Sequence, residues 1–273
     1  MCCFHQDYLD NSYLCFSSDS TKTLNFIDDY FKNWILAQGG QEYHVPALIN
    51  RNVLEKCGYF SSFPQHLTVA GFVKPEFYPN VATDSEVKDE YIAMKEQYLT
   101  PAACLHIYPM LEGDNIKENT AITTLARVYR YEHGNFDGIT RLWDFTVREI
   151  VFVGASDYVL RQLEKTKQLA LEFTQKLGLS ADIIEANDQF YPSQKNIIKA
   201  KLQKANSLKH ELSLQIKEKQ VAIASFNFHD THFSKAFNFD DGGKIVTGCV
   251  GFGLERWLAV INENNIHLDK VTY

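Results

Sequence analysis

Strand patterns that follow one another directly, rather than alternating with helices, constrain the fold of this chain most strongly. Residues 124–132 and 141–153 alternate polar and apolar side chains around a glycine-containing connection, which predicts a long antiparallel hairpin. Further strands are predicted at 182–185, 208–216, 220–227, 232–239 and 244–249. Runs of strands, with helices segregated between them, predict an α+β fold built on an antiparallel sheet.

Helices are predicted between these runs of strands. Residues 21–38 place Phe31 and Ile35 on one face, and Gly39-Gly40 ends that helix. Further helices are predicted after Asn50, from Thr100-Pro101 with Cys104 in the first turn, from Ser156 to about Gly178, at 193–204 and from about Gly251. Because no repeat or long linker divides these elements, we expect a single domain over residues 1–273.

The composition disfavours two broad classes of protein. A net charge of -7 is unlike that of a general nucleic-acid binder, which is normally basic. No apolar run approaches the ~20 residues of a membrane-spanning helix. The N-terminal MCCFHQDYLD lacks the basic and apolar regions of a signal peptide. We therefore expect a cytoplasmic protein whose six cysteines are mostly free thiols or metal ligands.

The segment TGCVGFGLER, residues 247–256, carries the strongest functional pattern. Gly251 and Gly253 allow the backbone to approach a ligand closely. Arg256, at the start of the following helix, offers a planar fork for phosphate. Cys249 places a thiol among these glycines. The combination predicts a nucleotide site with a metal ligand in its wall.

The predicted hairpin carries a second pattern, of charged and aromatic side chains. Because side chains alternate along a strand, Arg130 shares a face with Glu132, and Arg141 shares one with Phe145 and Glu149. One face then offers cations for phosphates, a carboxylate for an amino group and a ring that stacks on a base. An ordinary exposed sheet face gives the same alternation, but the glycine–arginine segment favours the nucleotide site.

These patterns resemble those of a known enzyme family. Arg-x-Glu, a loop and Arg-x-x-x-Phe-x-x-x-Glu resemble motif 2 of class II aminoacyl-tRNA synthetases, and GFGLER resembles their motif 3. The helix, strand and Pro46 that precede them resemble motif 1, the dimerisation element. More closely, the chain resembles the amino acid:[carrier protein] ligases, which are truncated homologues of the atypical, zinc-dependent seryl-tRNA synthetases. The resemblance implies a class II synthetase-like antiparallel sheet flanked by helices.

The matching segments span most of residues 20–262. They are VPALINRNVLEKCGYFSSFP, YLTPAACLHIYP, VYRYEHGN, RLWDFTVREIVFVG, LKHEL, AIASFNFHDTHF and TGCVGFGLER. Motifs 2 and 3 alone are moderately specific. The match becomes strong because candidate metal ligands also occur within the matching segments.

Within these segments the resemblance implies a zinc site formed by Cys104, Glu149 and Cys249. Three protein ligands leave a fourth position open, and the family implies that this position takes the α-amino group of an amino acid. The alternative interpretation is two buried structural cysteines and a surface glutamate. Cys57 is interpreted as a core residue. His229 is interpreted as a structural histidine, because no Cys or His accompanies it at metal-binding spacing.

The resemblance also implies a two-step reaction. The amino-acid carboxylate attacks the α-phosphate of ATP, and the acyl group then passes to the phosphopantetheine thiol of a holo carrier protein. Arg130 would hold the α-phosphate, Glu132 would accept from the adenine amino group and Phe145 would stack on the ring. Arg141 and Arg256 would hold the distal phosphates. Arg130 and Arg256 are the expected catalytic residues, acting by positioning and charge stabilisation.

The remaining site residues are expected mainly on the strands that follow the hairpin. The ATP-binding set implied by the resemblance is Arg130, Glu132, Arg141, Leu142, Phe145, Lys209, Glu211, Ala222, Ile223, Ala224, Ser225 and Arg256. Glu149 and Asn227 are expected to contact the amino acid. Glu211 is the candidate ligand of the Mg²⁺ that accompanies ATP, because residues 222–225 lack the glutamate that synthetases commonly carry nearby. Lys209 could contact the phosphates, but an exposed strand lysine is the preferred interpretation.

The expected partners follow from the same resemblance. The amino acid is expected to be small, with glycine or alanine favoured, and the protein is expected to form a homodimer. No tRNA-binding arm or anticodon-binding domain accompanies the matched segments, so a carrier protein rather than tRNA is the expected acceptor. The basic helix at 193–204 either docks an acidic carrier or is a solvated face.

Two alternative functions stay open beside the carrier-protein ligase. The adenylate could pass to tRNA or to a peptide amine instead. A catalytically silent synthetase paralogue is the other alternative, and the retention of Arg130, Arg141 and Arg256 argues against it.

Overall fold

The computed structural model describes residues 8–10, 13–114, 116–131, 140–216, 219–240 and 242–268. Its central element is a seven-stranded sheet. The strand order is β3-β7-β8-β12-β11-β10-β9. The strands are β3 (Gln41–Glu42), β7 (Thr120–Tyr129), β8 (Asp144–Gly154), β9 (Asp182–Glu185), β10 (Lys209–Ile216), β11 (Lys219–Asp230) and β12 (Val246–Gly253). All neighbours pair antiparallel except β3 and β7, which are parallel. This arrangement confirms the predicted α+β fold with an antiparallel core.

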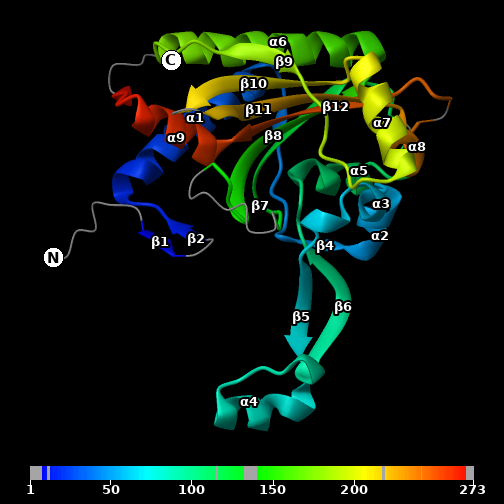
Figure 1. Ribbon diagram of the computed structural model, residues 1–273. Coiled ribbons are helices and arrows are strands. Elements are labelled where there is room, and N and C mark those ends of the chain that lie inside the picture. The colour runs from blue at the N-terminus through cyan, green and yellow to red at the C-terminus, as the bar shows by residue number, and fades with distance from the viewer. Residues whose placement is uncertain are drawn as a thin grey trace.

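Helices α1 (Ser18–Ala37), α6 (Ser156–Lys176) and α9 (Leu254–Glu263) pack on one face of the sheet (Figure 1). Alternate residues of β8 and β12 point to this face, where Phe152 and Phe252 are fully buried. Phe31 of α1 stacks on Phe252 with ring centroids 3.7 Å apart. Trp257 of α9 lies 5.0 Å from Phe173 of α6, centroid to centroid. Large aromatic side chains therefore fix the three helices to the sheet and to one another.

The opposite face of the sheet packs against short helices. These are α2 (Arg51–Lys56), α3 (Tyr59–Ser62), α5 (Ile107–Met110), α8 (His232–Ala236) and the 3-10 helix η4 (Ala103–His106). Val128 and Val151 of the sheet share a second core with Leu105, Tyr108 and Phe233 of these helices. Helix α7 (Gln194–Ala205) lies near the edge formed by β9 and β10 (Figure 1). The remainder of this face lines a large cleft.

A hairpin projects away from the sheet and helices. β5 (Val69–Val73) and β6 (Ile92–Leu99) form it, and α4 (Tyr78–Asp84) lies at its tip (Figure 1). β4 (Leu48–Asn50) pairs with β6 at the base of this hairpin. β1 (Tyr8–Asp10) and β2 (Tyr13–Cys15) form a separate two-stranded sheet. Short 3-10 helices η1 (Pro64–His66), η2 (Pro75–Phe77) and η3 (Asp89–Tyr91) complete the elements.

Three predicted elements differ from the structure. The strand predicted at 232–239 is wrong, because α8 occupies its start; Phe233 and Phe237 are four residues apart and both buried, which is helical spacing. The helix predicted from Thr100 begins later, as η4, and the Thr100 side chain bonds to His106 instead of capping it. The last helix starts at Leu254, because β12 continues through Gly253.

A buried ion pair connects the sheet to α1 on the helix-covered face. Arg148 of β8 is 1 % exposed and donates to both carboxylate oxygens of Asp28, at 2.6 and 2.8 Å. It also donates to Glu42 of β3, at 2.9 Å. Because both acceptors are carboxylates, the guanidinium charge is compensated inside the protein. Arg148 therefore has a structural role, although it lies within the motif 2 pattern.

No helix in the described part of the chain combines the length and apolarity needed to cross a membrane. The described cysteines, Cys15, Cys57, Cys104 and Cys249, form no disulfide with one another. Cys2 and Cys3 lie outside the described residues.

Candidate active site

A cleft of roughly 1060 Å³ opens on the sheet face opposite α1, α6 and α9. Its volume is at the upper end of ordinary small-molecule sites, which reach about 1,000 Å³, so it has room for a nucleotide and a second substrate. Every predicted site residue within the described part of the chain borders it. Glu132 lies outside the described residues, so its expected contact with adenine stays a prediction.

Two rows of side chains cross the sheet at the floor of the cleft. The pairing register places Glu211, Ser225, Gly251 and Glu149 in one row and Lys209, Asn227, Cys249 and Val151 in the next. Because alternate residues of a strand share a face, both rows point to the cleft side. The antiparallel register thus brings together residues from four strands that are far apart in the sequence.

The glycines of β12 serve different purposes. A Cβ at Gly251 would lie 3.2 Å from Oε2 of Glu149, so the glycine leaves space for that carboxylate. A Cβ at Gly248 would lie 2.8 Å from Cγ1 of Val159, so this glycine allows α6 to approach the other face. Gly253 borders the cleft, and a Cβ there would make only ordinary contacts. The prediction of a glycine-lined ligand wall therefore applies to Gly251 and Gly253.

Cys104, Glu149 and Cys249 lie together in the cleft. Cys104 comes from η4, Glu149 from β8 and Cys249 from β12, and one ligand atom of each lies within 4.8 Å of the others. All three side chains are buried. A zinc ion binds sulfur at about 2.3 Å and carboxylate oxygen at about 2.0–2.2 Å, so ligand atoms around one ion are roughly 3.5–4 Å apart. The three residues fit such an ion.

The electrostatics of this cluster favour a bound cation. Burial raises the pKa of Glu149 to about 7, although a hydrogen bond with Cys249 and the positive charge of Arg130 oppose the shift. The hydrogen bond with Cys104, burial and the negative charge of Glu149 raise the pKa of the Cys249 thiol. Thr124, paired with Glu149 across β7 and β8, buries a hydroxyl that has no hydrogen-bond partner among the described residues. A divalent cation would compensate the buried negative charges.

Arg130 and Phe145 form the next part of the cleft. Arg130 follows β7 directly, and its Nε donates to the carbonyl oxygen of Pro101 at 2.8 Å. Its guanidinium carbon lies 5.5 Å from the ring centroid of Phe145, in a cation–π contact. Because the backbone and the ring both hold Arg130, its charge has a defined place beside Glu149. Arg130 is outside the regular strand, so strand alternation does not determine its direction.

Arg256 lies farther along the cleft. Its Nε donates to the carbonyl oxygen of Thr140 at 2.9 Å, and its Nη1 donates to that of Ala222 at 2.8 Å. These contacts join the start of α9 to β11 and to the segment before β8. Arg141 and Leu142 border the cleft in that segment, and Leu142 is buried.

The segment Ala222–Ser225 of β11 forms a wall of the cleft. Ile223 and Ala224 are also part of the core beneath α1, α6 and α9. Asn227 follows on the same strand, with its Nδ2 3.3 Å from Oγ of Ser225 and 3.7 Å from Sγ of Cys249. Asn227 therefore borders the cysteine–glutamate cluster directly.

Lys209 lies in an acidic network that the sequence pattern did not reveal. Its Nζ is 2.7 Å from Oδ1 of Asp188 and 3.2 Å from Oε1 of Glu211. Burial alone would lower the pKa of Lys209, but the two carboxylates outweigh it and raise the pKa. Gln203 of α7 donates to the other oxygen of Asp188 at 2.7 Å. The Lys209 side chain is 12 % exposed, so the alternative of an exposed strand lysine is wrong.

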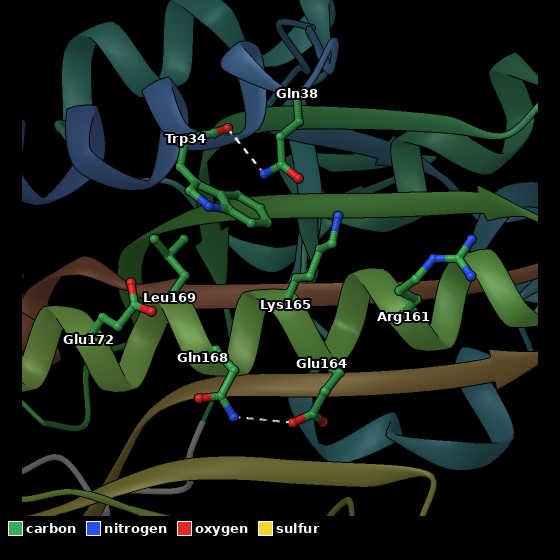
Figure 2. Close-up of a pocket in the computed structure, with 8 residues that line it drawn as sticks. All are labelled: Trp34, Gln38, Arg161, Glu164, Lys165, Gln168, Leu169 and Glu172. Atoms are coloured by element: carbon green, nitrogen blue, oxygen red, sulfur yellow. Dashed lines mark hydrogen bonds between the residues drawn. The ribbon is translucent and has the colours of Figure 1, made fainter.

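A second hollow, an open groove of roughly 530 Å³, lies between α1 and α6 (Figure 2). Trp34 of α1 and Gln38, which caps the end of that helix, face Arg161, Lys165 and Leu169 of α6 across it. None of the predicted site residues lines this groove. The chemistry-bearing side chains therefore gather in the large cleft on the other face of the sheet.

Comparisons with known proteins agree with this geometry. Residues 86–265 match the tRNA synthetase class II core domain (G, H, P, S and T). The chain belongs to the class II tRNA synthetase core-domain family. The class II core includes every predicted site residue, from Cys104 to Arg256. The chain is also a member of a ligase family, because the relatives it matches are named ligases.

The relatives of this class II core fall into two groups. The type-2 serine–tRNA ligase of Methanocaldococcus jannaschii is 28 % identical over an alignment of 240 residues, and the match covers 81 % of this chain and 46 % of that protein. Amino acid–[acyl-carrier-protein] ligase 1 of Bradyrhizobium diazoefficiens is 31 % identical over 229 residues, covering 80 % of this chain and 69 % of that protein. Ligase 2 of the same organism is 32 % identical over 222 residues.

Solved structures show the same fold. The M. kandleri SerRS bound to A. aeolicus tRNASec superimposes with a TM-score of 0.80 at 16 % identity, over 98 % of this chain and 56 % of that one. The cytoplasmic serine–tRNA ligase of Naegleria fowleri gives a TM-score of 0.71 over 93 % of this chain. The chain spans about half the length of these synthetases and of the type-2 serine–tRNA ligases. The likeness confirms the predicted class II synthetase fold.

Proposed function

We propose that the protein uses ATP to activate a small amino acid as an aminoacyl-adenylate and transfers it to the phosphopantetheine thiol of a carrier protein. The observation that carries the proposal is the meeting, in one cleft, of the Cys104, Glu149 and Cys249 cluster with Arg130 and Arg256. A metal site and phosphate-binding cations in the same cleft suit an enzyme that holds an amino group and a nucleotide together. The relatives named amino acid–[acyl-carrier-protein] ligase support the choice of acceptor.

In this proposal the arginines position ATP. Arg130 would stabilise the charge that develops on the α-phosphate while the amino-acid carboxylate attacks and pyrophosphate leaves. Phe145 would stack on adenine, and Glu132 would accept from its amino group. Arg141 and Arg256 would hold the distal phosphates. Their planar forks suit bidentate contacts with phosphate oxygens.

Cys104, Glu149 and Cys249 would hold a zinc ion whose chemistry, when bound, is to bind the α-amino group of the amino acid. Asn227, beside Cys249, would contact the same substrate. Glu211 would contribute to binding the Mg²⁺ that accompanies ATP. Lys209 forms ion pairs with Glu211 and Asp188, and it would place a positive charge near the proposed Mg²⁺ site.

The acidic surface typical of carrier proteins has a complementary basic counterpart in α7. Lys195, Lys201 and Lys204 lie on this helix, and Lys199 borders the cleft. Ile197, Ile198 and Leu202 are exposed on the same helix. Basic and apolar side chains at the cleft edge suit a partner whose contact surface has an apolar centre surrounded by acidic side chains. Charge complementarity would also increase the rate at which the two proteins associate. This supports the proposal that the carrier docks at α7.

The acceptor is tested by incubating the purified protein with ATP, Mg²⁺, zinc and a labelled amino acid, and with either holo carrier protein or total tRNA. The proposal predicts label on the holo carrier and none on the apo carrier, which lacks the thiol. The type-2 serine–tRNA ligase relatives favour tRNA as the second candidate acceptor. Label on tRNA but not on any holo carrier would overturn the carrier assignment and leave the adenylate step intact.

We also propose that the protein is a homodimer. The support is the resemblance of the α1 and β3 region to motif 1, the dimerisation element of class II synthetases. Light scattering coupled to gel filtration is expected to give twice the 31.3 kDa mass of one chain. A monomer mass at assay concentration would contradict this proposal.

A further inference from the structure

His229 contacts the cysteine–glutamate cluster from a direction that the proposed function does not explain. Its Nε2 lies 3.6 Å from Sγ of Cys249. On the other side of the ring, Nδ1 lies 3.2 Å from Oγ1 of Thr247 and 3.4 Å from the hydroxyl oxygen of Tyr108. One ring nitrogen therefore faces sulfur, and the other faces two hydroxyls.

The regular strand pairing breaks at His229. In the β11–β12 ladder, Phe228 pairs with Gly248 and Asp230 with Thr247, so the register shifts at His229. β-Bulges of this kind are frequent beside active sites. His229 is the extra residue of this bulge, and like Asn227, two residues earlier on β11, it borders the cleft.

Aromatic contacts hold the ring in place. His229 meets Phe233 edge-on, with centroids 4.9 Å apart, and Tyr108 edge-on at 6.2 Å. Tyr108 is itself stacked on Phe233 at 3.9 Å. Tyr108 and Thr247 are fully buried. A side chain packed in this way has little freedom, so its orientation toward Cys249 is preorganised.

The hydrogen-bonding pattern assigns the ring proton. A hydroxyl of Thr247 or Tyr108 can donate to Nδ1, whereas a thiolate has no hydrogen to donate to Nε2. The arrangement that satisfies all groups puts the proton on Nε2, where it points at Sγ of Cys249. Together with Nδ2 of Asn227, 3.7 Å from the same atom, the sulfur then receives donors from two residues of β11.

We propose that His229 is a positioning residue that donates a hydrogen bond from Nε2 to the Cys249 thiolate and thereby sets the geometry and donor strength of this metal ligand. The inference rests on the metal site of the proposed function. Partners that orient a metal ligand typically influence metal affinity about 10–100-fold. A hydrogen bond also withdraws electron density from the thiolate, so a metal ion bound there remains more electrophilic.

The test uses the full chain loaded with Co²⁺ in place of zinc, because the thiolate-to-cobalt charge-transfer band reports directly on the sulfur. His229→Leu removes the donor, and His229→Gln retains an N–H close to the position of Nε2. We expect His229→Leu to weaken metal affinity about 10–100-fold in a chelator competition and to shift the band to lower energy. His229→Gln should restore most of both properties.

His232→Leu is the matched control. This histidine also packs edge-on against Phe233, at 4.7 Å, but its Nε2 lies 3.3 Å from the carbonyl oxygen of Cys57 rather than from a ligand sulfur. Its cobalt band is expected to match that of the unchanged chain. The double variant Tyr108→Phe, Thr247→Val is expected to shift the band in the same direction as His229→Leu, because it removes the hydroxyls that orient Nδ1.

Three outcomes would overturn the inference. If His229→Leu leaves the band and the affinity unchanged, the histidine has no effect on the thiolate. If the Leu and Gln variants lose affinity equally while thermal unfolding shows both to be folded, the ring acts by packing alone. If the unchanged chain gives no thiolate–cobalt band, the proposed metal site fails, and the role of His229 fails with it.

Discussion

At the residue scale, the cluster of Cys104, Glu149 and Cys249 is the feature on which the account depends most. Three groups that carry negative charge when ionised are buried with their ligand atoms within 4.8 Å of one another. Burying such groups without compensation costs several kcal/mol per charge. Packing alone gives no reason for this arrangement, whereas a cation bound at the cluster does.

The first prediction concerns the sulfur of Cys249. Cys249→Ser should remove stoichiometric zinc and abolish amino-acid activation while leaving ATP binding largely intact, because the side chains proposed to bind ATP are not the metal ligands. Metal analysis and isothermal titration with ATP measure the two properties. Cys57→Ser is the control, since Cys57 is a buried cysteine outside the cluster. Full zinc retention in Cys249→Ser would contradict the assignment.

The second prediction concerns Arg130. Replacing it with alanine should slow adenylate formation by about 10²–10³-fold, the usual loss for one preorganised donor in the transition state. Arg130→Lys should recover little of this rate, because an ammonium group cannot reproduce the planar fork that Pro101 and Phe145 hold. Rapid-quench measurement of adenylate formation gives the rate directly. An undiminished rate in Arg130→Ala would exclude a role for this residue at the α-phosphate.

Some site residues were not predictable because their partners are distant in the sequence. Asp188 meets Lys209 only because the segment after β9 folds back toward β10. Alternation places His229 on the same face as Asn227, but the contact of its ring with Cys249 joins two strands, and β11 alone does not reveal it. The proximity of Cys104, Glu149 and Cys249 was predictable because each residue lies in a recognisable segment.

At the element scale, the sequence predicted most strands and long helices because their periodicity is regular. β9, β10, β11 and α1 lie close to their expected bounds. The error at 232–239 has a physical cause: phenylalanines at 233, 237 and 239 satisfy both a strand and a helical pattern, and tertiary burial favours α8. The predicted strands 124–132 and 141–153 are shorter at the connection, because β7 ends at Tyr129 and β8 starts at Asp144, so the faces of Arg130 and Arg141 could not be inferred from alternation.

The third prediction tests the assignment of the β12 glycines. Gly248→Ala should destabilise the fold by about 1–3 kcal/mol, because its Cβ would overlap Val159 of α6. Gly253→Ala should leave the unfolding midpoint nearly unchanged, since the added methyl makes ordinary contacts. Urea unfolding followed by circular dichroism compares the two. Equal stability of both variants would show that α6 does not depend on a close approach at Gly248.

At the scale of the whole molecule, the two faces of one sheet have separate roles. The face beneath α1, α6 and α9 provides a large aromatic core. The other face forms the floor of the cleft and carries the two rows of candidate site residues. This division follows from strand alternation, since residue 148 of β8 faces the structural ion pair and residue 149 faces the metal cluster. A rigid core on one face allows polar and charged residues to be held in place on the other.

The whole-molecule prediction is that the isolated protein activates an amino acid. The most direct measurement is ATP–pyrophosphate exchange with Mg²⁺ and zinc present, over a panel of all standard amino acids. We expect exchange that requires an amino acid, is greatest for one or a few small ones, and disappears in Cys249→Ser. No amino-acid-dependent exchange with any member of the panel, in protein shown to be folded and loaded with zinc, would contradict it.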